Sequence, residues 1–221
     1  MKTNKYKSDI TAGDIFSHAE KIYQASIAIK YTINSWPPEN NLEPTLTFTP
    51  SYYVTTSFVF ELLIKTLLVL DGHPPKEFHK PKYGHGLVDM YELLPEDWKN
   101  QLENEFNNRV ESSSEYIKQQ KVMELFGHGD YRHQSINEIL ALNNDRFKDF
   151  RYAYELSHEY MLQVYQHNDY EMLELINLMR SLVLLLQPEL EEKLLNNSWV
   201  GDLRNNRKPS PMSSSSRKTK N

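Results

Sequence analysis

The chain has 221 residues, of which 39% are hydrophobic, and its net charge is −5 at pH 7; that length supports one domain with a substantial core. Because the sequence contains no cysteine, disulfides, thiolate zinc sites and a cysteine nucleophile are excluded, and a reducing, cytoplasmic location is expected. Residues 203–221 carry six basic and no acidic side chains, so residues 1–202 sum to −11. An acidic body argues against broad nonspecific binding of nucleic acid, although it is compatible with a local basic pocket.

The first predicted helix covers about residues 11–33. Residues 1–8 are polar, show no apolar run after their lysines, and are predicted to be a disordered lead rather than a secretory signal. Either Thr11 or Asp14 can cap the helix, whose apolar residues recur at helical spacing. Residues 36–38 (Trp-Pro-Pro) end it, because proline cannot continue the hydrogen-bond ladder.

A second helix, apolar nearly all round, is predicted over residues 51–71, after an extended loop over residues 37–50 that ends in a proline. From residue 58 to residue 70 only Glu61, Lys65 and one threonine interrupt the apolar side chains. A helix without a solvent face belongs at the centre of a helical domain. Two ionisable residues in mid-span are expensive in lipid, so a core helix explains this segment better than a membrane span.

The second half of the chain is predicted to be helical between short breaks. A loop rich in proline and glycine precedes a short helix at 87–94, and Pro95 opens a helix that runs to about residue 111. Residues 112–135 are weakly patterned and are predicted to be an insertion or a mobile segment. The remaining predicted elements are a short helix at 136–142, a helix capped by Asp145, a strong helix at 169–187 and a trailing turn or helix after Pro188.

The predicted fold is therefore all-α: a bundle of about five main helices. Glycine is scarce, and no stretch alternates between apolar and polar residues for long enough to indicate a sheet. The helical domain is expected to occupy residues 9–200. The Ser-, Asn-, Lys- and Arg-rich residues 201–221 are expected to form a disordered basic tail.

Glu61 and Lys65 lie four residues apart on the most apolar helix. This spacing is common for an intrahelical ion pair at the edge of a core, where it contributes a few tenths of a kcal/mol. The same two residues could instead face other helices and bind polar partners there. The sequence leaves both interpretations open.

His85 lies between Gly84 and Gly86, which leave its imidazole unshielded, although an ordinary surface or capping histidine fits the pattern equally well. Evenly spaced histidines at 73, 79 and 85 have no cysteine nearby, so neither a metal nor a cofactor is expected. The common phosphate-loop, dinucleotide and metalloprotease signatures are missing as well. An enzyme here would use metal-independent acid–base chemistry or a carboxylate site that no common signature marks.

The densest polar constellation is in RFKDFRYAYELSH, residues 146–158. On a continuous helix Arg151, Glu155 and His158 share one face at i, i+4 and i+7. A merely solvated Arg151–Glu155 pair is the simpler interpretation. We expect this pair to meet Glu61 and Lys65, because four charges of alternating sign on two packed helices could neutralise one another.

Three segments, FELLIKTLLVLDG, GHGLVDMYELLP and RFKDFRYAYELSH, resemble the HEPN superfamily (higher eukaryote and prokaryote nucleotide-binding domains). Members often show an apolar helix with E-x-x-x-K spacing, a short GH-x-L helix and a late helix bearing arginine and histidine. The resemblance spans about residues 11–187. It implies an α-helical bundle that commonly forms a homodimer and acts on or binds RNA or a nucleotide, often in toxin or antiphage systems.

In many members an arginine, four to six residues and a histidine form a metal-independent ribonuclease site at the dimer interface. Six residues separate Arg151 from His158, which fits that spacing. The resemblance thus implies that His158 deprotonates the 2′-hydroxyl or protonates the leaving oxygen, while Arg151 stabilises the charge of the phosphorane.

A second expectation follows from Tyr152, which stands where many members have a polar residue after the arginine. FRYAYE resembles a subset of relatives that carry R-Y-x-Y-E without a catalytic histidine. In that subset Arg151 and Glu155 would be structural partners of the charged pair on the central helix. The chain would then be a non-catalytic binding or interaction module, or a purely structural subunit.

Overall fold

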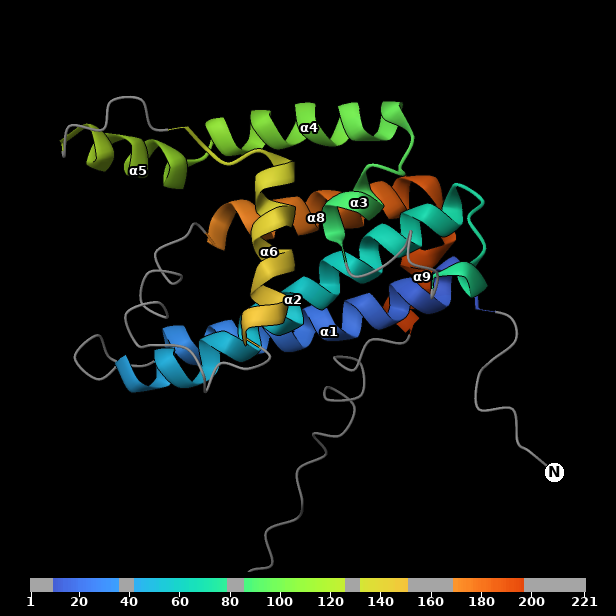
Figure 1. Cartoon of the computed structure of the whole chain (residues 1–221), viewed down its shortest axis with the longest axis horizontal. Helices are drawn as coiled ribbons and strands as arrows, with labels where there is room; N and C mark the ends of the chain where they lie inside the picture. Colours follow the sequence, from blue (N-terminus) through green and yellow to red (C-terminus); the bar gives the residue numbers. More distant parts are fainter. Residues whose placement is uncertain (1–9, 36–41, 79–85, 126–131, 151–168, 197–221) are drawn as a thin grey trace, which may run out of the picture.

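The computed structural model describes residues 10–35, 42–78, 86–125, 132–150 and 169–196. In chain order the helices are α1 (Ala12–Asn34), α2 (Leu42–Leu70), the 3₁₀ turn η2 (Pro75–Glu77), α3 (Leu87–Tyr91), α4 (Glu96–Glu111), α5 (Ser114–Leu125), α6 (Ile136–Phe150), α8 (Asp169–Leu186) and α9 (Glu189–Asn196). Within these ranges there is no strand (Figure 1). The predicted all-α bundle is confirmed.

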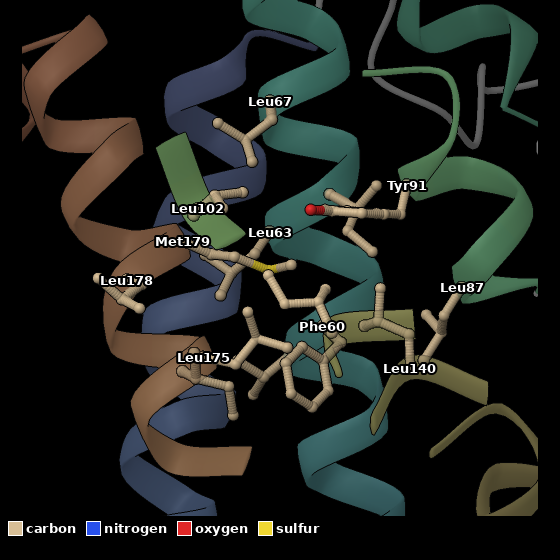
Figure 2. Packing of buried hydrophobic residues seen from close by; sticks show 14 of the residues in the cluster. Phe60, Leu63, Leu67, Leu87, Tyr91, Leu102, Leu140, Leu175, Leu178 and Met179 are labelled. Carbon is tan, nitrogen blue, oxygen red and sulfur yellow. The ribbon is translucent and has the colours of Figure 1, made fainter. Parts of the chain in front are cut away.

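Helix α2 lies at the centre, as its composition predicts, and contacts α1, α3, α6 and α8 (Figure 1). Its apolar side chains are buried on several sides at once, and Figure 2 shows them meeting those of α3, α6 and α8. The fully buried members are Val59, Phe60, Leu63, Ile64, Leu67 and Leu68. Phe58 is 36% exposed, so α2 retains one partly exposed stripe. Each buried leucine or phenylalanine contributes about 1.5–3 kcal/mol relative to an exposed one.

One prediction about this helix is wrong: residues 42–50 are helical, not an extended loop. Helix α2 begins at Leu42, and Pro50 lies inside it. An internal proline removes one hydrogen bond and costs about 3 kcal/mol. Buried Thr49, Tyr52 and Tyr53 flank it, and α1 packs along α2. Tertiary packing therefore offsets the local cost of the proline.

Two helices begin with capping boxes, one of them formed by both residues, Thr11 and Asp14, that the sequence offers as alternative caps. Before α1, the Thr11 hydroxyl accepts a hydrogen bond from the Asp14 amide at 3.2 Å, and the Thr11 amide donates to the Asp14 carboxylate at 2.9 Å. Before α6, Ser135 and Glu138 exchange the same pair of bonds at 3.2 and 2.8 Å. These bonds satisfy amides that a helix N-terminus leaves unpaired.

Gly72 ends α2. Its φ of +94° lies in the left-handed region that favours glycine. The Gly72 amide donates to the Val69 carbonyl at 3.0 Å, and the His73 amide donates to the Leu68 carbonyl at 2.9 Å. These two bonds form a Schellman motif.

The predicted break at residues 143–145 is wrong, because α6 continues to Phe150. Asn143 is 1% exposed. Its side-chain amide donates to the Ile139 carbonyl at 2.8 Å, and its own carbonyl accepts from the Ser57 hydroxyl of α2 at 2.9 Å. Asn143 is thus hydrogen-bonded within its own helix and to the neighbouring one, so its side chain does not pair with nearby backbone in a way that would end the helix in a turn.

The other predicted helices have the expected places. In α3 and the turn after it, four apolar residues are all buried: Leu87, Met90, Tyr91 and Leu94. Helix α4 follows Pro95, and α8 ends before Pro188. The sequence pattern does not predict α5, whose apolar residues alternate irregularly with Lys, Gln and Glu.

Within the described residues, Phe48–Leu70 is the one helix long and apolar enough to cross a membrane, and 61% of its most apolar window is buried inside the bundle. A core helix of a soluble protein passes the same test. The structure is therefore compatible with a soluble protein.

The capping box of α6 makes stability depend on pH. Arg132 and both groups of Ser135 donate hydrogen bonds to Glu138 and lower the pKa of its carboxyl to about 2. Because the pKa is lower in the folded state, the contribution is complete above the ordinary pKa and is lost as the pH falls toward 2. We expect Glu138→Ala to cost about 1 kcal/mol at neutral pH.

The difference in unfolding free energy between Glu138→Ala and the wild type should stay constant from pH 7 down to the ordinary pKa of a carboxyl group, and it should then shrink as urea titrations are repeated toward about pH 3. Glu103→Ala, at an exposed position of α4, is the control and should show a small, flat difference. A pH-independent cost at Glu138 would contradict the assignment.

Candidate functional site

The structure describes two of the predicted site residues, Glu61 and Lys65. The others lie outside the described residues: His85, Arg151, Tyr152, Glu155 and His158. Whether the late helix brings its charges to α2 therefore stays a prediction, as does the arginine–histidine geometry.

Glu61 and Lys65 form an ion pair within α2, in which the Lys65 ammonium donates to Glu61 Oε1. The Lys65 side chain is only 15% exposed and that of Glu61 only 11%. Phe78, which follows η2, packs against the lysine with its ring centroid 5.7 Å from Nζ. Both predicted charges are therefore held at the edge of the core.

This arrangement limits what the pair does chemically. The burial of two charges is tolerable when they face each other, but it is costly for either one alone. The contact between an ammonium and a ring face adds a further attraction of about 0.5–2 kcal/mol. The pair is therefore well suited to fixing α2 and the segment after it, and it can serve a ligand only through rearrangement.

The structure contains a second polar cluster, made by α1 and α8, that the sequence analysis does not identify. Arg180 forms two hydrogen bonds to the Glu20 carboxylate, one of them 2.7 Å long, and its guanidinium lies 4.6 Å from the centroid of the Tyr23 ring. Asn177 accepts hydrogen bonds from the Tyr23 hydroxyl at 3.1 Å and from Arg180 at 3.2 Å. We call Glu20, Tyr23, Asn177 and Arg180 the α1–α8 clasp.

The α1–α8 clasp is largely closed to solvent. Tyr23 and Glu20 are each 8% exposed, and burial raises the pKa of the Tyr23 phenol, against the opposing effect of Arg180. Arg180 is the only basic residue in α8. A single cation in an apolar helix is the sequence feature that could have pointed to this cluster. Because each charged group is bonded inside the chain, the clasp is structural rather than an open binding site.

A groove of about 230 Å³ lies between α4 and α8. Leu102, Leu178 and Leu182 are buried along it, whereas Leu185 is 64% exposed. On its wall, the guanidinium nitrogens of Arg109 lie 3.7 Å from Glu105 Oε2 and 3.8 Å from Glu174 Oε2. The groove is thus apolar at its base and charged at its edge, which is the character of a surface that receives a side chain or a helix.

Among the described residues no group of three or more His, Asp or Glu side chains could hold a metal ion. No family model matches the chain, and no curated protein or solved structure matches it either. The resemblance to the HEPN superfamily thus rests on the three sequence segments alone.

The burial of the Glu61–Lys65 pair predicts a stronger coupling than its spacing alone does. We expect a double-mutant cycle with Glu61→Gln and Lys65→Met to give a coupling free energy of about 1 kcal/mol or more. Glu105 and Arg109 have the same spacing on α4, but their side chains are 51% and 44% exposed. The matching cycle there should give only a few tenths of a kcal/mol.

Both cycles are measured by urea unfolding at one pH and salt concentration. Equal coupling in the two pairs would show that the core does not enclose Glu61 and Lys65.

Arg180 should not tolerate lysine, because an ammonium cannot donate two parallel hydrogen bonds to Glu20 and stack on Tyr23 at once. We expect Arg180→Lys to lower the unfolding free energy by about 1–2 kcal/mol. Arg132 makes a similar paired contact with Glu138, but its side chain is 69% exposed. Arg132→Lys should therefore lower the unfolding free energy less than Arg180→Lys does. A larger cost for Arg132→Lys would contradict the description of the α1–α8 clasp.

Proposed function

We propose that the chain is a HEPN-like helical protein that acts on or binds RNA or a nucleotide, with Arg151 and His158 as a metal-independent ribonuclease site. One observation supports this best. The helix that carries the E-x-x-x-K spacing is α2, the central helix of an all-α bundle, and the resemblance implies a bundle of that kind.

The chemistry of the proposed site needs no metal. Cleavage of RNA next to a 2′-hydroxyl requires a base, an acid and a cation near the phosphorane. His158 supplies the proton transfer, and Arg151, which stays charged at any physiological pH, supplies the cation. The resemblance places such a pair at the interface of a homodimer, where each site faces its partner copy.

A second function is favoured by the state of Lys65. Its ammonium is bonded to Glu61 and lies against Phe78, so it has the environment of a structural residue. If Arg151 and Glu155 complete that pair, the four charges form an internal network and the chain is a non-catalytic binding or interaction module.

The ribonuclease proposal predicts cleavage of single-stranded RNA in the presence of EDTA. Replacing His158 or Arg151 by alanine should lower the cleavage rate by at least about 100-fold, as expected for loss of a proton-transfer group or of charge stabilisation. His18→Ala, at an exposed position of α1, is the matched control and should cleave at the wild-type rate.

Two outcomes separate the alternatives. Equal cleavage by the wild type and His158→Ala would assign the activity to another site or to a contaminant. RNA binding without cleavage by the wild type, measured by fluorescence anisotropy, would favour the non-catalytic module.

A further inference from the structure

We draw no further inference here: the strongest candidate, the leucine-lined groove between α4 and α8, balances Arg109 against Glu105 in its lining, and nothing in the structure shows what covers it.

Discussion

Burial of α2 is the constraint on which the rest of the bundle depends. Its apolar side chains point in several directions, so one partner helix cannot cover them. Helices α1, α3, α6 and α8 together do so. Each of these needs only one apolar face, because α2 supplies the common core. Polar contacts then fix the positions of the covering helices. The Ser57 hydroxyl of α2 donates a hydrogen bond to the Asn143 carbonyl of α6, and the α1–α8 clasp joins two helices that contact α2.

The sequence predicts the parts of this fold that local chemistry determines. The helix ends depend on hydrogen bonds to neighbouring backbone, so the residue types alone indicate them. Examples are the capping boxes of Thr11 with Asp14 and of Ser135 with Glu138, and the helix end at Gly72. Where long-range packing decides, local reasoning is wrong. Pro50 lies within α2, which packs along α1. Asn143 lies within α6, where its backbone carbonyl accepts a hydrogen bond from Ser57 of another helix.

In the candidate site, too, local spacing predicts some features and long-range packing decides the others. That Glu61 and Lys65 pair follows from a spacing of four residues, but the degree of their burial does not. Phe78 covers Lys65 from a segment rich in proline, where no periodicity places a side chain. Arg180 was not predicted because a single cation in an apolar helix has no partner nearby in sequence; Glu20 lies 160 positions away. Arg151 and His158 lie outside the described residues, so their geometry stays a prediction.

The position of Lys65 between Glu61 and Phe78 has a thermodynamic consequence for any anion that binds there. To reach a phosphate, the ammonium has to leave a carboxylate and an aromatic ring at once, so the observed affinity is the intrinsic affinity reduced by the population of the opened state. Linkage makes the effect reciprocal. A ligand that captures Lys65 releases Phe78, and a partner that displaces Phe78 makes Lys65 easier to capture. Phe78 is thereby coupled to the central helix through Lys65.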